Sequence, residues 1–184
     1  MRILFTANPL VGHWLPMVPL VEAARQAGHD VVVAVGPDLV ADVRRRGTTA
    51  WSIGPDLATI QDGVAVRPRP AAETPYEGVV ADGMQMFAVP AVARARDLLD
   101  RTAAWRPDVV VREIYELAGA WVDAPVHVLH GLGTHYPGFV ELAETALGRV
   151  ADVLGPPRWT SPVRTTPYVD PFPASLQPPE DHPF

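Results

Sequence analysis

The sequence has 184 residues, a net charge of −6 and no cysteine. Its length fits one domain, its mild acidity argues against a general nucleic-acid-binding surface, and the lack of cysteine excludes disulfides, thiolate metal sites and cysteine nucleophiles. Every basic residue is an arginine, so mechanisms that need a lysine are excluded as well. No apolar run reaches the ~18–20 residues of a membrane span, and no leader sequence opens the chain. We therefore expect a cytoplasmic protein with neither a membrane nor a nucleic acid as partner.

The first 35 residues predict a strand–turn–helix–strand unit. Residues 3–6 form a short apolar run of the kind that a buried parallel strand shows. A turn over residues 8–12 leads into a helical pattern that Gly28 ends, and a second apolar run covers residues 30–35. Such units cross over right-handed into a parallel sheet, whose ligand sites lie outside the carboxyl ends of the strands. His13 follows the first of those ends, which makes its imidazole the first candidate for chemistry.

The alternation of strands and helices continues along the chain. Apolar runs predict further strands over residues 49–53, 109–111 and 126–129, and they allow a short edge strand at Tyr168–Val169. Helical patterns fill the intervals, over residues 37–46, 83–105, 116–121 and 139–154. This alternation predicts an α/β fold, a single domain built on a Rossmann-like, doubly wound parallel sheet.

Two features break the regular pattern. Residues 54–82 are rich in proline and glycine and show no sustained period. Long loops inside compact domains are uncommon, so this stretch is either a flexible wall of a binding cleft or a disordered insertion. Pro90 lies inside the helical pattern that begins at Gly83, where it either kinks the helix or marks its true start.

A carboxylate is predicted to lie close to His13. Glu113 stands at the carboxyl end of the strand predicted over residues 109–111. In the usual doubly wound order this fourth strand lies directly beside the first. His13 and Glu113 are far apart in sequence, yet they would then occupy adjacent strand ends.

Other chemistries find little support in the sequence. The first turn contains a lone Gly12 in place of the three-glycine dinucleotide fingerprint, and there is neither a Walker sequence nor a Gly-x-Ser-x-Gly elbow. His127, His130 and His135 are spaced in a way that invites a metal site. Residues 127 and 130 of a strand face opposite sides, however, and no acidic ligand pattern accompanies them. We predict no metal site.

Five segments of the chain, in this order, resemble one family: VGHWLPMVPL, AGHDVVVAVGPDL, WRPDVVVRE, YELAG and YVDPFPASLQ. They are similar to bacterial natural-product glycosyltransferases, which are GT-B enzymes of glycosyltransferase family 1. The resemblance implies one half of a GT-B fold, with residues 1–165 as the acceptor-binding domain. Residues 166–184 would form a proline-rich tail leading to a C-terminal donor domain. The implied reaction is the inverting transfer of a deoxysugar from a nucleotide-sugar to a hydroxyl of an aglycone.

The resemblance also implies roles for particular residues. The family's catalytic base falls on His13, and the carboxylate that orients it falls on Glu113, where aspartate is also common. The acceptor-binding positions fall on Gly12, Trp14, Met84, Phe87, His135 and Tyr136. These side chains suggest a broad aromatic or polyketide acceptor. No cofactor is implied in this chain, since the TDP- or UDP-sugar donor would bind the C-terminal domain.

The sequence leaves a second function open. The chain is either the acceptor half of a glycosyltransferase or a catalytically silent module that binds an aglycone and acts with a separate transferase chain. Its implied partners are the small-molecule aglycone and the donor domain, in the same chain or another, and self-association into a homodimer is a further expectation. The segment between Gly119 and Pro125 is shorter than in typical members of the family. We therefore expect a shortened helix after the fourth strand.

Overall fold

The computed structural model describes residues 1–65, 83–131, 139–161, 166–171, 173 and 175. At its centre lies a six-stranded, wholly parallel sheet with the order β3-β2-β1-β4-β5-β6. The strands are β1 (Arg2–Thr6), β2 (Asp30–Val35), β3 (Thr49–Ser52), β4 (Val109–Glu113), β5 (Val126–His130) and β6 (Tyr168–Val169). This is the predicted doubly wound order, in which the chain starts in the middle of the sheet and winds outward in both directions.

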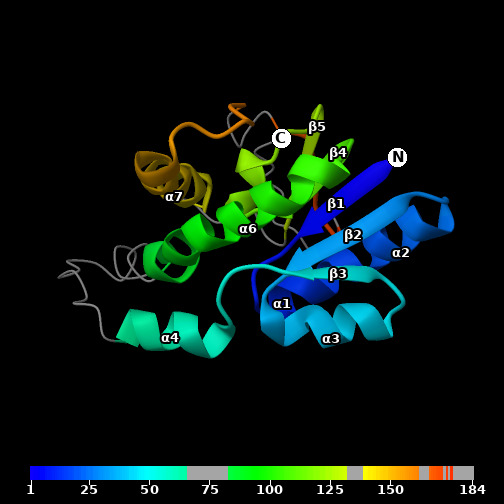
Figure 1. Ribbon diagram of the computed structural model, residues 1–184, viewed down its shortest axis with the longest axis horizontal. Coiled ribbons are helices and arrows are strands. Elements are labelled where there is room, and N and C mark those ends of the chain that lie inside the picture. The colour runs from blue at the N-terminus through cyan, green and yellow to red at the C-terminus, as the bar shows by residue number, and fades with distance from the viewer. Residues whose placement is uncertain (66–82, 132–138, 162–165, 172, 174, 176–184) are drawn as a thin grey trace.

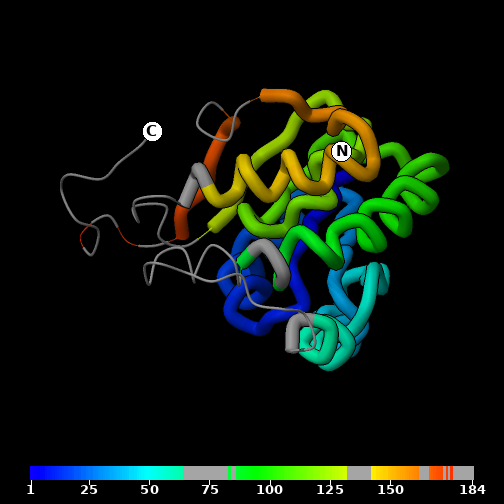
Figure 2. Tube along the Cα trace, turned by 90° about the vertical axis from the view of Figure 1, so that its left-hand side faces the viewer, coloured from blue at the N-terminus to red at the C-terminus, as the bar shows by residue number. Residues whose placement is uncertain are grey.

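Helices cover both faces of the sheet (Figure 1). The described helices are α1 (Val11–Trp14), η1 (Leu15–Met17), α2 (Val18–Gln26), α3 (Pro37–Arg45), α4 (Leu57–Ala65), η2 (Met84–Ala88), α6 (Val89–Trp105), η3 (Ala118–Trp121) and α7 (Phe139–Leu154). One face packs against α1, η1, α2 and α3, and the other packs against α6, η3 and α7. In Figures 1 and 2, α6 and α7 lie side by side on their face of the sheet.

The two cores follow from alternation along the buried strands. Phe5 of β1 and Val33 of β2 join the core under α1 and α2, whereas Leu4 and Val32 join the core under α6 and α7. Successive side chains of a strand point to opposite faces, so continuous apolar runs supply both cores at once. Among the described segments, none of the helices combines the length and the apolarity that a membrane span requires.

Most of the predicted elements are confirmed, and their ends follow the expected signals. Gly28, with φ of 78°, follows α2, and Gly47, with φ of 75°, follows α3. Pro90 lies in the first turn of α6 and marks its true start, because the preceding turn, η2, is π-helical. The helix after β4 is reduced to the single 3₁₀ turn η3, as the short segment there predicts.

Two predictions are corrected. Residues 54–82 are not one irregular stretch, since Leu57–Ala65 form α4. The signal for its start is Asp56, whose Oδ1 accepts a hydrogen bond from the Thr59 backbone N–H at 2.7 Å, as an N-cap residue does. The remainder, 66–82, lies outside the described residues. The folded unit also extends beyond residue 165, because β6 pairs with β5 through Leu129↔Tyr168 and His130↔Val169.

Candidate active site

The candidate site lies where the chain reverses its direction of winding, at the carboxyl ends of β1 and β4. These strands are neighbours, with Thr6 opposite Arg112 in the register. The turn after β1 leads into α1, which carries His13, while β4 ends at Glu113. Loops diverge at such a switch point and leave room for a ligand. The predicted adjacency of His13 and Glu113 is therefore confirmed.

The two side chains are in direct contact. His13 Nδ1 lies 2.9 Å from Glu113 Oε2, and the side chains of the two residues are 23% and 6% exposed. The imidazole therefore reaches the surface while the carboxylate stays beneath it. Since Nδ1 donates to the carboxylate, the other ring nitrogen, Nε2, is the one that can accept a proton.

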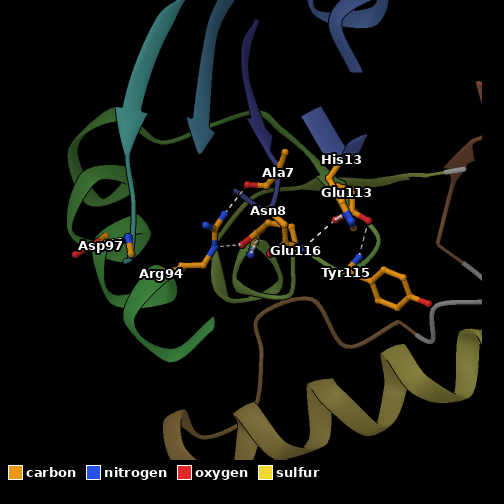
Figure 3. A network of polar contacts seen from close by, with 10 residues as sticks. Ala7, Asn8, His13, Arg94, Asp97, Glu113, Tyr115 and Glu116 are labelled. Carbon is orange, nitrogen blue, oxygen red and sulfur yellow. Dashed lines mark hydrogen bonds and ion pairs between the residues drawn. The ribbon is translucent and has the colours of Figure 1, made fainter. Parts of the chain in front are cut away.

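Every oxygen of the Glu113 carboxylate is engaged. Oε2 accepts a second hydrogen bond, from Asn8 Nδ2 at 2.9 Å, and Oε1 accepts one from the Tyr115 backbone N–H at 3.0 Å. Figure 3 shows Glu113 between His13 and the backbone of Tyr115. Hydrogen bonds to an ionised carboxylate are stronger than neutral ones, so the carboxylate is held in one orientation and in turn orients the imidazole.

The electrostatics of His13 favour the protonated ring. Burial by itself lowers the pKa of His13, but the negative charge of Glu113 and its hydrogen bond outweigh burial and raise the pKa above the ordinary 6.5. In its neutral form this histidine can take a proton from a hydroxyl, and its partner carboxylate stabilises the imidazolium that results. This base-plus-orienter arrangement is the logic of the hydrolytic triads.

A pair of aromatic rings adjoins the imidazole. The Phe87 ring centroid lies 5.6 Å from that of His13, and the Tyr115 centroid lies 6.5 Å from it. Phe87 and Tyr115 stack on each other, with centroids 4.9 Å apart and ring planes within 6°. Phe87 comes from η2 and Tyr115 from the turn after β4, so segments that are distant in the sequence converge beside His13.

A second polar network, which is fully buried, lies beside the site. Arg94 of α6 donates from Nε to Glu116 Oε1 at 3.1 Å and from Nη2 to the Ala7 carbonyl at 2.6 Å. Glu116 Oε2 accepts from the Gly119 backbone N–H at 3.0 Å. Figure 3 shows this network beside Asn8 and Glu113. It joins α6 to the strand ends, so the turn that follows β1 has little freedom to move.

The other predicted site residues have different outcomes. Gly12 is exposed, and nothing lies within 4 Å of where a Cβ would stand. Trp14 is 1% exposed in the core under α2, and its Nε1 donates to Asp42 Oδ2 at 2.8 Å. Its ring therefore stabilises the fold, and the expectation that Trp14 contacts an acceptor is wrong. Met84 lies in η2, but its side chain, like His135 and Tyr136, is outside the described residues.

Two of the three histidines whose spacing suggested a metal site, His127 and His130, lie on different faces of the sheet. His127 is opposite Val110 in the register and His130 is opposite Glu113, so their side chains point away from each other. His127 stacks on Trp159 with centroids 4.7 Å apart. Within the part of the chain that the structure describes, no three acidic or histidine side chains come together as metal ligands would.

Sequence reasoning missed Asn8 and Tyr115. Both lie directly after a predicted buried strand, Asn8 after β1 and Tyr115 after β4. The rule that ligand sites lie at the carboxyl ends of parallel strands applies to these positions as much as to His13. Their place after the carboxyl end of a strand could have identified them as candidates. It does not indicate which of the side chains there point toward the site.

The sheet order defines a Rossmann-like α/β domain, and the switch point of its sheet carries a histidine–carboxylate pair. No family model matches the chain. It is 34% identical over 187 residues to an L-demethylnoviosyl transferase of Streptomyces niveus, covering 97% of this chain and 46% of that relative. The chain belongs to the natural-product deoxysugar glycosyltransferases and corresponds to their N-terminal half.

Solved structures show the same fold. The glycosyltransferase SsfS6 from Streptomyces sp. SF2575 superimposes with a TM-score of 0.78 at 22% identity, over 97% of this chain and 52% of that one. The spinosyn rhamnosyltransferase SpnG gives a TM-score of 0.72 at 26% identity, over 99% and 48%. The chain thus spans about half the length of the relatives that it matches.

Proposed function

We propose that this chain is the acceptor-binding half of an inverting glycosyltransferase that moves a deoxysugar onto a hydroxyl of a natural-product aglycone. The observation that carries the proposal is the 2.9 Å contact between His13 Nδ1 and Glu113 Oε2 at the switch point of the sheet. Support comes from the relatives' names, which include an erythronolide mycarosyltransferase of Saccharopolyspora erythraea, and from SpnG, which has been crystallised with the spinosyn aglycone.

In the proposed reaction His13 acts as the general base. Its Nε2 takes the proton from the acceptor hydroxyl, and the hydroxyl oxygen forms a bond to the anomeric carbon of the sugar. The bond from that carbon to the nucleoside diphosphate breaks on the opposite face, the diphosphate leaves with the electron pair, and the configuration inverts. Glu113 stabilises the imidazolium that results, in the way that the carboxylate of a triad does.

The donor belongs to the other half of the proposed enzyme. SsfS6 and SpnG have both been crystallised with thymidine diphosphate, and we assign a TDP- or UDP-sugar to a donor domain outside these 184 residues. That domain and the aglycone are the proposed partners. If the donor domain is a separate chain, this chain alone serves as an aglycone-binding module and transfers sugar only when the two are combined.

The test is His13→Ala in the protein that carries both halves, assayed with a nucleotide-sugar and an aglycone. General-base catalysis contributes about 10²–10⁴-fold, so we expect kcat to fall by that factor with little change in KM for the donor. His29→Ala is the matched control, because His29 lies in the turn before β2, outside the candidate site. Transfer that stays within a few-fold of wild type in His13→Ala contradicts the proposal.

A further inference from the structure

Asn8 shares one carboxylate oxygen with the imidazole of His13. Its Nδ2 donates to Glu113 Oε2 at 2.9 Å, and His13 Nδ1 lies at the same distance from that oxygen. A carboxylate oxygen has two lone pairs and can accept from both donors, but both draw on the same negative charge. Asn8 is 2% exposed, so bulk water does not weaken its hydrogen bond. The amide therefore competes with the imidazole for Oε2.

The turn that carries Asn8 is fixed by the residue before it. The N–H of Ala7 donates to the Ala34 carbonyl at 3.2 Å, and the carbonyl of Ala7 accepts from Arg94 Nη2 at 2.6 Å. Both groups of this buried residue are thus paired, as buried backbone groups require. Asn8 continues from this anchored residue toward Glu113 (Figure 3). The amide cannot leave the carboxylate unless these contacts also change.

The strength with which Glu113 holds the imidazolium matters for a base. Although burial lowers the pKa of His13, the charge of Glu113 and its hydrogen bond raise this pKa above 6.5. A general base works only in its neutral form, so a carboxylate that held the imidazolium too strongly would keep the base protonated at neutral pH. A second donor on Oε2 stabilises the carboxylate whether or not the ring is protonated, and this reduces the free energy gained when the ring takes up its proton.

We propose that Asn8 is a positioning residue of the base, which divides the charge of Glu113 Oε2 between two donors and so limits how strongly His13 holds its second proton. This inference rests on the proposed function, since it concerns the base of the same site. The amide also requires an ionised carboxylate, because a protonated Oε2 could not accept from two donors. Asn8 thereby keeps the shared proton on His13 Nδ1 and leaves Nε2 to accept the proton of the hydroxyl.

Other charged or titratable side chains surround the pair in the described part of the chain. They are Arg94 of α6, Arg112 of β4, Tyr115 and Glu116 of the turn after β4, and His130 of β5. A substitution of Asn8 leaves all of these side chains in the sequence. A change in the pKa of His13 in an Asn8 variant therefore reports on the hydrogen bond to Oε2.

Asn8→Leu tests this role in the 184-residue chain, because leucine has nearly the shape of asparagine but lacks the donor. NMR titration follows the imidazole C–H signals of His13, which are assigned by their loss in His13→Ala. We expect the pKa of His13 to rise by about 0.5–1, since a hydrogen bond to a charged group is worth about one pKa unit. An unchanged pKa overturns the proposal. A lowered pKa overturns it too, because the amide would then serve only to hold the carboxylate against the ring.

Thr6→Val is the matched control. It removes a buried hydroxyl two residues before Asn8, on the face of the sheet where Thr6 Oγ1 lies against Gly119 of η3. The substitution should leave the pKa of His13 unchanged. Near-ultraviolet circular dichroism checks that both variants are folded.

A second measurement needs no variant. Asn8 is the only asparagine in the sequence, so labelling with ¹⁵N-asparagine gives a single pair of side-chain amide signals. We expect these signals to shift at the pH at which His13 titrates, because protonation of the ring draws the charge of Oε2 toward Nδ1. Amide signals that stay constant through this titration contradict the shared oxygen, even if Asn8→Leu does not fold.

The effect on transfer separates this role from a merely structural one. In the protein that carries both halves, Asn8→Leu should move the pH at which transfer rises upward by the same amount as the pKa. At higher pH, kcat should stay within a few-fold of wild type, as should KM for the donor. Activity that falls equally at every pH, with no change in the pH at which it rises, overturns the proposal.

These outcomes are distinguishable from failure of the proposed function. If His13→Ala abolishes transfer while Asn8→Leu leaves the pKa of His13 unchanged, the base is right and the role of Asn8 is wrong. If Asn8→Leu raises this pKa while His13→Ala still transfers sugar, Asn8 limits the proton affinity of the imidazole, but His13 is not the base.

Discussion

At the scale of single residues, Glu113 joins His13 to Asn8 and to the turn after β4. Its Oε2 accepts from both His13 and Asn8, and its Oε1 accepts from the backbone of Tyr115. Asn8 is 2% exposed, so its amide serves the carboxylate and does not face a ligand. The carboxylate therefore cannot turn away from the imidazole without losing hydrogen bonds that buried groups need.

Replacement of Glu113 by Gln is expected to lower the pKa of His13 below 6.5. The charge of Glu113 and its hydrogen bond are what outweigh burial in raising that pKa, and the neutral amide leaves burial dominant. NMR titration of the imidazole measures the change, with Glu22→Gln on the exposed side of α2 as the control. A general base accepts a proton only in its neutral form, so the role proposed for His13 predicts that the pH at which transfer rises also moves downward. A His13 pKa equal to that of wild type contradicts this account.

At the scale of elements, Arg94 joins α6 to the turn that follows β1. Its guanidinium is buried between Glu116 and the Ala7 carbonyl, so its aliphatic stem has a fixed course. The turn between β3 and α4 passes directly over that stem at Gly54, where a Cβ would collide with Arg94 Cγ. Gly54 also donates its N–H to Asp97 Oδ2 at 2.7 Å, which fastens the turn to α6.

Gly54→Ala is therefore expected to destabilise the fold by about 1–3 kcal/mol, the range for a substitution that forces a buried neighbour to move. Its φ of 66° adds strain, because an L side chain rarely adopts that conformation. Gly148→Ala is the matched control: this glycine lies in α7, and nothing is within 4 Å of its Cβ position. It should stabilise the protein by about 0.5–1 kcal/mol. Urea denaturation measures the free energy of unfolding of both variants. Equal effects of the two substitutions would contradict the collision with Arg94 as the cause.

At the scale of the whole molecule, the segment after α7 closes over the sheet next to β5. Trp159 donates its backbone N–H to the Ala120 carbonyl at 3.0 Å, and its ring stacks on His127. Burial, followed by the positive charge of Arg112, lowers the pKa of His127 to about 4. The folded protein therefore keeps His127 neutral, and protonation of this buried ring would destabilise the fold.

This buried histidine predicts a loss of stability in acid. Between pH 6.5 and about pH 4 the unfolded chain binds a proton at residue 127 and the folded protein does not, so the free energy of unfolding falls as the pH falls. His127→Phe keeps a ring against Trp159 and removes the titration. As the pH falls over this interval, the free energy of unfolding of the variant should decrease by up to about 3 kcal/mol less than that of wild type. Chemical denaturation at a series of pH values measures the free energy of unfolding, with His29→Gln as the control. If this free energy depends on pH in the same way in wild type and in His127→Phe, the titration of His127 does not cause the loss of stability.

Much of the fold and part of the site could be predicted without coordinates. The strand runs, the helix ends at Gly28 and Gly47, and the neighbouring positions of β1 and β4 depend on local apolar patterns and on the handedness of crossovers. These rules concern the course of the backbone, so small errors in the bounds of an element leave the predicted order of the strands unchanged. The start of α4 depended instead on a single capping side chain, Asp56, inside a stretch whose prolines and glycines suggested a loop.

The sequence by itself determined the doubly wound sheet and the meeting of His13 with Glu113, because apolar periodicity and strand order place the ends of strands whatever the side chains do. Only the tertiary structure decided where the side chains between these anchors point. It turned Trp14 into the core and Asn8 toward the carboxylate, and it stacked Tyr115 on Phe87 beside His13. The physical reason is that side-chain direction is set by packing between segments distant in the chain, which no local pattern records.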